Sequence, residues 1–187
     1  MGTTKSGRYL NTKGTGRSIS DYALVHSNEG TFIWKDIRRN GKPAKQIRIA
    51  SGGHGQRGMD LLDKYHIKYN ITKTWANGVR VGNVPDHKDK RKARANNQAW
   101  FPKQWTTKDI KRAGEHVASL KHNRNTSNGK PVFGVYKGVR VGVIRTKVRL
   151  ATIFPDVDQS SVLRACSVSL PARPACIFSA IFCQNPR

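Results

Sequence analysis

The sequence predicts an α+β fold in which small antiparallel sheets pack around one main helix. Short runs rich in β-branched and aromatic residues, separated by turn residues, fill the first half of the chain. One amphipathic pattern at 107–120 indicates a helix, and three closely spaced strand patterns follow residue 130. We therefore expect one domain over residues 21–158, long enough to enclose a modest core.

Strands dominate the expected first half of this domain. The strand-like runs are Tyr22–Val25, Thr31–Trp34, Gln46–Ala50, Ile67–Ile71 and Val79–Val84. Between the third and the fourth run, Met59 and Leu62 fall on one face of a short helix, with Tyr65 or His66 as the next member of that face. The first half is thus expected to be mainly β structure.

The main helix is predicted from Thr107 to about Leu120. Thr106 can cap its first turn, with Asp109 three residues on as the capping-box partner. The apolar residues recur at helical spacing and consist of Ile110, Ala113, Val117 and Leu120. Such a stripe indicates a helix with one face on the core.

The last part of the domain is expected to be an antiparallel meander. Its strand patterns are Val132–Tyr136, Val139–Ile144 and Val148–Phe154. The segment Asn77–Val84 recurs, with small changes, as Lys137–Ile144, and in both copies an arginine points away from the valine face. Two related β modules and chance convergence on a common hairpin pattern both account for this repeat.

The two ends of the chain differ in composition from the domain between them. Residues 1–20 are rich in Gly, Ser, Thr and Lys and are expected to form a flexible leader. No acidic residue follows Asp158, and residues 159–187 are interpreted as a disordered or non-native tail, or alternatively as a short partner-binding segment. All three cysteines lie in this tail, so we expect neither a disulfide framework nor a disulfide-linked oligomer.

The charge balance points to a polyanionic partner. Thirty-five Lys and Arg residues stand against 11 Asp and Glu, which gives a net charge of +24. This excess repels itself in the folded state, and nucleic acid phosphates are the first candidate partner, ahead of an anionic membrane. No apolar run approaches the roughly 18 residues of a membrane span, so no membrane association is expected. The scarcity of acids disfavours a two-metal nuclease, and no metal site is expected.

Histidine chemistry remains open to such a protein. Cleavage of RNA by acid–base catalysis needs one group to deprotonate the ribose 2′-OH and another to protonate the leaving 5′-oxygen. His54 lies in a Gly-Gly-His-Gly segment, whose glycines let a ligand approach closely, and His87 lies just before a basic run. His26 and His66 are alternatives to His54. His116 and His122 belong to the main helix and its end, where a structural role is expected.

The densest basic run is Lys88–Arg94, closely followed by Trp100, Phe101 and Trp105. Cations beside aromatic rings suit a single-stranded nucleic acid, because phosphates are neutralised while bases stack. The residues expected to bind RNA are Lys88, Lys90, Arg91, Lys92, Arg80 and Arg140.

Two motifs in the second half carry a family resemblance. Trp100–Ile110, which reads WFPKQWTTKDI, resembles the entry into the helix of bacterial EndoU nucleases. Leu150–Pro155 is similar to the closing strand of that family, which ends in a Thr-x-Phe-Pro motif, and His87 stands some fourteen residues before the first Phe-Pro. The resemblance covers roughly residues 50–158.

The resemblance implies an endoribonuclease that needs no cofactor, being metal-independent or manganese-stimulated, and that leaves 2′,3′-cyclic phosphate ends. Such enzymes use two histidines, a lysine and a Thr or Ser near the closing strand. Carried over, His87 is the second histidine, Thr152 the hydroxyl and His54 the first histidine, with the two alternatives above still open. Where the family often has a lysine, this chain has Gln98, and the substitute is Lys92 or Lys103.

The resemblance also implies a biological setting. Bacterial members are commonly the toxin modules of secreted or contact-delivered effectors, act in the cytoplasm of a target cell and are neutralised by a cognate immunity protein. Residues 1–6 lack the apolar segment of a signal peptide. The alternative function is that of a non-catalytic, basic RNA- or DNA-binding protein. A metal-dependent HNH nuclease is disfavoured, because Asn97 is followed by no nearby histidine.

Overall fold

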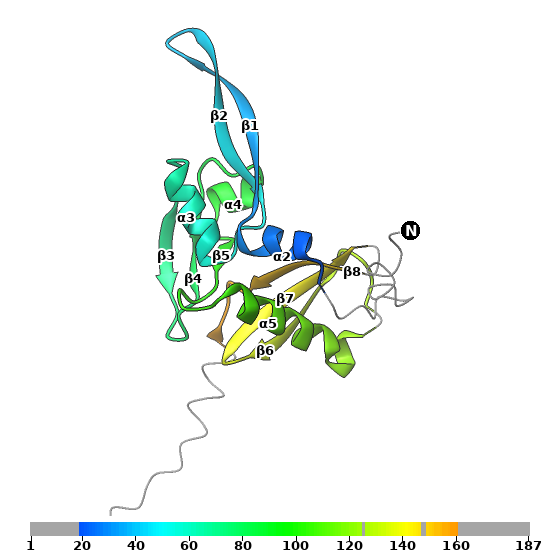
Figure 1. Ribbon diagram of the computed structural model, residues 1–187. Coiled ribbons are helices and arrows are strands. Elements are labelled where there is room, and N and C mark those ends of the chain that lie inside the picture. Colours follow the sequence, from blue (N-terminus) through cyan, green and yellow to red (C-terminus); the bar gives the residue numbers. More distant parts are fainter. Residues whose placement is uncertain (1–18, 125, 147–148, 161–187) are drawn as a thin grey trace, which may run out of the picture.

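The computed structural model describes residues 19–124, 126–146 and 149–160. These residues form four α-helices, one 3₁₀ turn and eight strands in three small antiparallel sheets (Figure 1), which confirms the predicted α+β class. In chain order the elements are α2 (Asp21–Asn28), β1 (Thr31–Arg39), β2 (Lys42–Ser51), α3 (Gln56–Lys64), β3 (Asn70–Thr74), β4 (Arg80–Asn83), α4 (Lys90–Arg94), β5 (Gln98–Trp100), α5 (Thr107–Ser119), η2 (Lys121–Asn123), β6 (Pro131–Tyr136), β7 (Val139–Thr146) and β8 (Arg149–Pro155).

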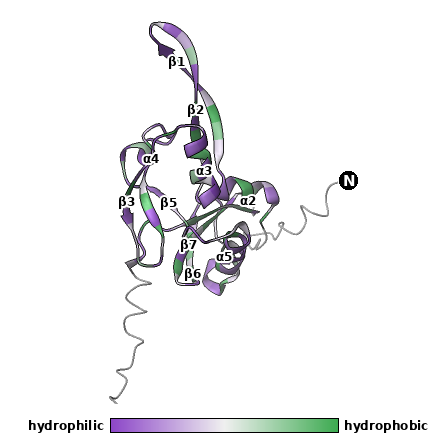
Figure 2. Ribbon diagram, turned by 60° about the vertical axis from the view of Figure 1, so that its left-hand side comes forward, coloured by the Kyte–Doolittle hydropathy of each residue, from purple (hydrophilic) through white to green (hydrophobic). Residues whose placement is uncertain are grey.

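The three sheets follow the order of the chain. β1 pairs with β2, β4 lies between β3 and β5, and β7 lies between β6 and β8, with antiparallel pairing throughout. The predicted meander is therefore confirmed. The β1–β2 hairpin projects well beyond the rest of the domain (Figure 1), and its turn end is hydrophilic (Figure 2).

The hairpin is longer than the sequence patterns indicate. The predicted strands end at Trp34 and begin again at Gln46, but in the structure only Asn40 and Gly41 form the turn between β1 and β2, with φ of 52° and 76°. Positive φ at both central residues is typical of a type I′ turn, whose twist matches that of the flanking strands. Pairing therefore begins at once, with Arg39 opposite Lys42.

The first predicted strand is wrong, because Tyr22–Val25 belongs to helix α2. The Ser20 side chain caps this helix by accepting a hydrogen bond from the backbone N–H of Ala23, at 3.2 Å. Four consecutive apolar residues are compatible with either a strand or a helix, and the period of two was misleading here. Burial of Ala23, Leu24 and Ser27 on one side follows the helical period.

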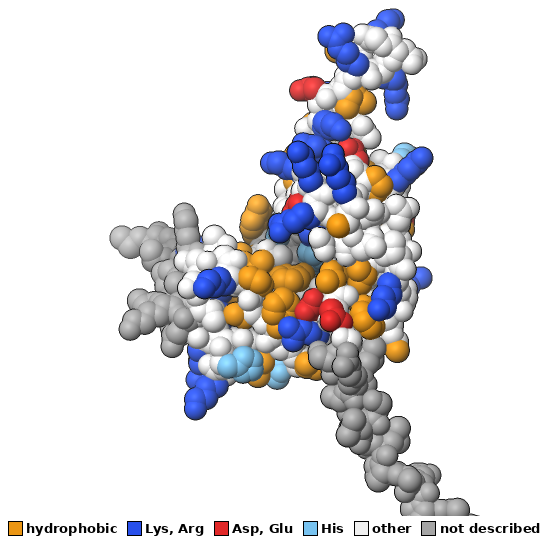
Figure 3. All heavy atoms as spheres, turned by 180° about the vertical axis from the view of Figure 1, so that it is seen from behind, with side chains coloured by type: hydrophobic (Ala, Val, Ile, Leu, Met, Phe, Trp, Pro, Cys, Tyr) orange, Lys and Arg blue, Asp and Glu red, His pale blue; other side chains and the backbone are white. Residues whose placement is uncertain are grey.

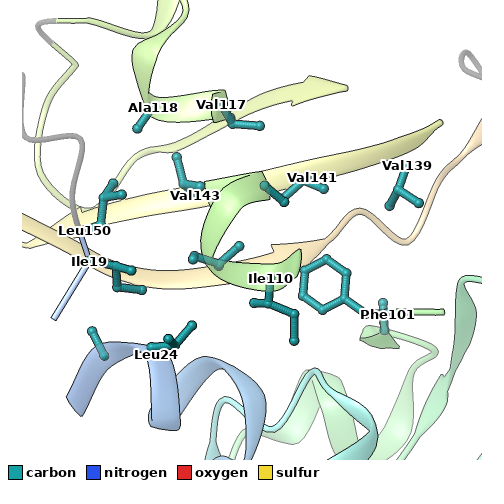
Figure 4. Packing of buried hydrophobic residues seen from close by; sticks show 14 of the residues in the cluster. Ile19, Leu24, Phe101, Ile110, Val117, Ala118, Val139, Val141, Val143 and Leu150 are labelled. Atoms are coloured by element: carbon teal, nitrogen blue, oxygen red, sulfur yellow. The ribbon is translucent and has the colours of Figure 1, made fainter. Parts of the chain in front are cut away.

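Helix α5 forms as predicted and packs on the meander. Thr106 and Asp109 make the capping box, each side chain accepting a hydrogen bond from the other residue's backbone N–H, at 3.2 and 3.0 Å. Ile110 and Val117 of α5 belong to one buried cluster with Val141 and Val143 of β7, and Ile110 lies beside Phe101 (Figure 4). This cluster is the main core, and it holds β8 against both α2 and α5.

A second, smaller cluster lies between the base of the hairpin, α3 and β4–β5. It contains Ile49, Met59, Leu62, Ile67, Val84 and Trp100, all of them buried. The short helix predicted around Met59 and Leu62 is thus confirmed as α3. The hairpin base is consequently fixed to the domain, while its outer half extends away from it.

The folded unit is slightly wider than residues 21–158. Ile19 is buried and bridges to Leu150 of β8, and the Gln159 side chain bonds to the backbone of Arg140. The remainder of the expected leader, residues 1–18, and of the expected tail, residues 161–187 with its cysteines, lies outside the described residues. No helix in the described part of the chain has the length and apolarity that crossing a membrane requires.

Candidate active site

A pocket of about 300 Å³ lies where α2, the segment after β2, α4 and β8 meet. Two histidines, one lysine and one threonine face it together with an aromatic ring. The lining residues are His26, Ser51, Gly52, His54, Lys92, Asn97, Ala99, Ile144, Thr152, Phe154, Pro155, Asp156 and Val157. The pocket thus draws side chains from segments that lie more than 100 residues apart in the chain.

The two pocket histidines are brought together by backbone hydrogen bonds. The N–H of Gly53 donates to the carbonyl of His26 at 3.1 Å, and the N–H of His54 donates to the carbonyl of Ser27 at 2.7 Å. The N–H of Gly55 donates to the carbonyl of Asn28 at 3.0 Å. The final carbonyls of a helix have no partner within the helix, so this segment satisfies the end of α2.

Glycine is required for this approach. Gly52 has a φ of +71°, and a Cβ there would collide with the carbonyl oxygen of His26. A Cβ on Gly55 would collide with the side chain of Asn28. The sequence predicts that these glycines leave room for a ligand, but the end of α2 fills that room. Their effect on the site is to set the distance between the imidazoles.

Gln98 secures the same segment from the other side. It is fully buried in β5, and its amide nitrogen donates to the carbonyl oxygens of Gly52 and Gly53, both at 3.2 Å. The resemblance often places a lysine near this position. In this chain the position supports the backbone, and Lys92 of the preceding helix supplies an ammonium group to the pocket.

The imidazole of His54 is oriented by a backbone carbonyl. Its Nδ1 lies 2.7 Å from the carbonyl oxygen of Ala99, which can only accept, so Nδ1 carries the proton. Nε2 then bears the lone pair and lies 3.5 Å from Nζ of Lys92. Burial and the nearby ammonium group hold the pKa of His54 well below its usual range. At neutral pH the ring is an uncharged base.

His26 and Lys92 are perturbed in the same sense. Nδ1 of His26 lies 3.0 Å from the hydroxyl of Thr31, and burial together with Lys92 lowers the pKa of His26. Burial lowers the pKa of Lys92 to about 8. A lysine with such a pKa is still mostly protonated at pH 7, so the pocket contains a desolvated cation between neutral imidazoles.

His87 lies behind the pocket and does not line it. The ring is buried, and the N–H of Asp89 donates to its Nδ1 at 2.8 Å. Burial and Lys92 lower the pKa of His87 to about 4. The ring is close enough to His54 to affect the pKa of that histidine, although His26 has the larger effect. The structure therefore brings His54 together with His26 at the pocket, and places His87 at the start of α4.

Thr152 and Phe154 reach the pocket from β8. Between them, the backbone N–H of Ile153 donates to the buried hydroxyl of Ser27 at 2.9 Å, which fixes β8 to α2. The ring of Phe154 lies 5.9 Å from that of His54. Thr152 was selected from the sequence. The Thr-x-Phe-Pro motif also contains Phe154. Residues two positions apart on a strand face the same side, so the motif could have predicted that Thr152 and Phe154 point into one site.

The residues expected to bind RNA separate into two groups. Lys88, Lys90 and Arg91 are exposed on and before α4, and Asp89 pairs with Arg91 at 3.3 Å. Lys92, from the same run, points into the pocket. Helix α4 was not predicted from the sequence, although its N-cap Asp89 accepts a hydrogen bond from the N–H of Arg91.

Two other arginines from that group are engaged within the protein. Arg80 donates to Gln56 and to the carbonyl of Phe101, at 2.8 and 2.6 Å. Arg140 pairs with Asp156 at 2.6 Å and lies over the ring of Phe133. Both therefore hold parts of the domain together.

The other candidates lie away from the pocket. His66 follows α3 and lines a separate hollow with Asp63 and Lys68. His116 lies on α5 and packs near Tyr136 of β6, and Lys103 is exposed in the segment before α5. In the described ranges, no three His, Cys, Asp or Glu side chains are grouped so that they could hold a metal ion.

Replacing Gly52 tests the contact between the glycine segment and α2. We expect Gly52→Ala to lower the free energy of unfolding by about 3 kcal/mol or more, because the Cβ adds a collision to the strain of positive φ. Gly41→Ala is the matched control, since its φ is +76° and a Cβ there meets no atom within 4 Å. It should lose only about 1 kcal/mol. Equal losses in urea unfolding would contradict the role assigned to the contact.

Comparison with known proteins agrees with this geometry. The bacterial EndoU nuclease family matches residues 26–157, a segment that begins at His26 and ends just beyond the closing strand. No curated protein and no solved structure matches the chain. The match covers more than half of the sequence and includes every residue that lines the pocket. The chain belongs to the bacterial EndoU nuclease family.

Proposed function

We propose that this nuclease cleaves RNA by attack of the ribose 2′-OH on the adjacent phosphorus, giving a 2′,3′-cyclic phosphate and a free 5′-OH. One observation carries the proposal: His26, His54 and Lys92 face a single pocket. Two imidazoles supply a base and an acid, and an ammonium group supplies positive charge for the phosphate. DNA lacks the 2′-OH, so this chemistry selects RNA.

His54 is proposed as the general base. Its Nδ1–H is bound to the carbonyl of Ala99, so Nε2 is the atom available to accept the proton of the 2′-OH. The lowered pKa keeps this nitrogen unprotonated at neutral pH. When the proton arrives, the carbonyl of Ala99 stabilises the resulting imidazolium through the existing hydrogen bond.

His26 is proposed as the general acid that protonates the leaving 5′-oxygen. Its pKa is lowered less than that of His54, and its Nδ1 is held by Thr31, which leaves Nε2 toward the pocket. A bound phosphate is a negative charge beside the ring, and such a charge raises the pKa of a histidine. Substrate binding therefore favours the protonated form that this step needs.

Lys92, Thr152 and Phe154 complete the proposed site. Lys92 stabilises the negative charge that builds on the non-bridging oxygens, and the Thr152 hydroxyl binds the phosphate or the base. The ring of Phe154 offers a face on which a base can stack. Under this assignment His87 is a positioning residue, since its bond to Asp89 sets the start of the helix that carries Lys92.

We further propose that the domain is the toxin part of a delivered effector, with the cytoplasm of a target cell as its place of action and a cognate immunity protein as its partner. The family membership and the charge of +24 support this. An immunity protein that covers the pocket would need an acidic surface, because the surroundings of the pocket are basic.

Product analysis is the first test. We expect the purified protein to shorten RNA in the presence of EDTA and to leave 2′,3′-cyclic phosphate ends, because neither proton transfer needs a metal ion. Mass spectrometry of the new 3′ ends checks this, and a parallel reaction with Mn²⁺ measures stimulation. Salt-dependent RNA binding with no new ends would instead identify a non-catalytic binding protein.

Substitution of the histidines tests their roles. We expect His54→Ala and His26→Ala each to lower the cleavage rate by about 10²- to 10⁴-fold while RNA affinity changes little. Each substitution removes a group that transfers a proton, but it removes no cation that binds the phosphates of RNA. His116→Ala on α5 is the control and should retain the wild-type rate. Full activity of either pocket variant would reject its assignment. A loss in His87→Ala as deep as in His26→Ala, with unfolding unchanged, would return the acid role to His87.

The pH dependence tests the charge states. The value of kcat/KM should rise with pH as His54 loses its proton. It should then fall as His26 loses its proton, at a pH below the ordinary histidine pKa of about 6.5, because the pKa of His26 is lowered. A second fall should begin near pH 8, where Lys92 becomes neutral. In Lys92→Arg the cation persists, so only this second fall should disappear. A second fall that remains in this variant would rule out Lys92 as its cause.

A further inference from the structure

The β1–β2 hairpin has an unusual charge distribution. Residues 31–51 contain six Lys or Arg and a single acid, Asp36. Lys35, in the half of the hairpin near the domain, pairs with Asp86 at 3.1 Å, and Lys45 lies opposite Asp36. The cations at the turn end are Arg38, Arg39 and Lys42, and all three are exposed. Lys and Arg side chains gather at this end and at the hairpin base (Figure 3).

These charges oppose the stability of the hairpin. Arg39 and Lys42 face each other across the strands, and like charges in directly opposite positions are destabilising. Arg38 lies opposite Pro43, which offers no charge. In the described part of the chain, no ion pair joins these three side chains to an acid. Folding therefore does not explain them, whereas an external polyanion would.

Both strands of the hairpin begin or end at the pocket. Thr31, the first residue of β1, holds the ring of His26, and Ser51, the last residue of β2, lines the pocket. The two residues are paired with each other. The hairpin is thus an arm rooted at the pocket rim, and strands of nine and ten residues extend it by about 30 Å.

The base of the arm is joined to the basic helix α4. The N–H of Lys88 donates to the carbonyl of Ile49 in β2 at 3.0 Å, and the ion pair of Lys35 in β1 with Asp86 links the other strand to the same segment before α4. Exposed Lys88, Lys90 and Arg91 therefore lie beside the arm and next to the helix that brings Lys92 into the pocket. Pocket, α4 and hairpin form a connected cationic surface.

We propose that the hairpin is an RNA-binding arm, which holds the part of the substrate that lies outside the pocket, and that the preferred substrate is consequently a long RNA. This proposal rests on the proposed function, because the path of the RNA from the pocket along the arm assumes that RNA is cleaved in the pocket. The arm neutralises phosphates, a contact that does not depend on base sequence.

Trp34 adds an aromatic contact to this surface. Its side chain is 68% exposed near the middle of the arm, although a tryptophan usually buries most of its surface. Stacking of a base on an exposed ring is favourable and tolerates any base, as expected for binding without sequence preference. Trp34 and the cations of the turn end therefore suit the same ligand.

The test removes the charge of the turn end. In Arg38→Gln/Arg39→Gln/Lys42→Gln we expect binding to an RNA of about 30 nucleotides to weaken about tenfold or more, and the slope of log K against log salt to become shallower by about 2. Cleavage of a dinucleotide, which reaches only the pocket, should keep its wild-type rate. The melting temperature should not fall, because repulsion between the strands is relieved. Trp34→Ala should separately weaken binding of the long RNA.

The matched control removes three exposed cations from the opposite part of the domain, as Lys108→Gln/Arg112→Gln/Lys121→Gln on α5 and the turn after it. It carries the same net charge and should bind and cleave the long RNA nearly as the wild type does. Equal losses in both triple variants would show an effect of net charge alone and overturn the arm. Wild-type binding in the hairpin variant would also overturn it and leave the hairpin as a surface for another partner, such as an acidic protein.

The arm and the proposed reaction fail in different ways. If the wild type cleaves neither RNA, the proposed function fails, and the affinity and salt slope of the two triple variants still decide whether the hairpin binds RNA. If the hairpin variant loses dinucleotide cleavage together with long-RNA cleavage, while its melting temperature is kept, the hairpin acts on the pocket itself and the arm is rejected.

Discussion

The contact between residues 53–55 and the end of α2 determines where the groups of the pocket lie. Three backbone N–H groups satisfy the last carbonyls of the helix, and the histidines at positions 26 and 54 are attached to the two sides of that contact. Gln98 holds the same segment from β5, and Ser27 of α2 binds the backbone of β8. The glycine segment and β8 are therefore both bonded to the end of one helix, and a small displacement there would move both imidazoles and the closing strand.

The electrostatics of the pocket follow from the burial of Lys92 and of the two histidines. Lys92 is desolvated between two imidazoles, and Asp156, the acid among the lining residues, is already paired with Arg140. Burial outweighs the opposing effect of Asp89, so the pKa of Lys92 falls, and burial together with the nearby ammonium group lowers the pKa of both histidines. A phosphodiester in the pocket would add negative charge beside Lys92. The site thus sacrifices stability in the free protein for an electrostatic gain when an anionic substrate binds.

The sequence predicted the class of the fold and much of its second half, because those signals are local. The capping box at Thr106, the stripe on α5 and the meander depend on near neighbours in the chain and on regular alternation. The prediction failed for Tyr22–Val25, where four apolar residues suit two kinds of element. It also could not assign Gln98, since a buried amide that bonds two distant carbonyls leaves no pattern in a single sequence. His54, Lys92 and Thr152 were named from their types and motifs, but which imidazole faces which depends on tertiary contacts.

The hairpin explains why spacing along the chain misleads at this site. His26 and His54 are 28 positions apart in the sequence, and this spacing alone does not mark them as partners. Residues 31 and 51 are paired, however, so the chain leaves the pocket rim and returns to it at one place. The distance between the imidazoles is consequently independent of the length of the hairpin. An insertion that starts and ends at the rim can change in length and charge without moving the groups of the pocket, and this freedom allows an additional binding surface to be placed directly beside the pocket.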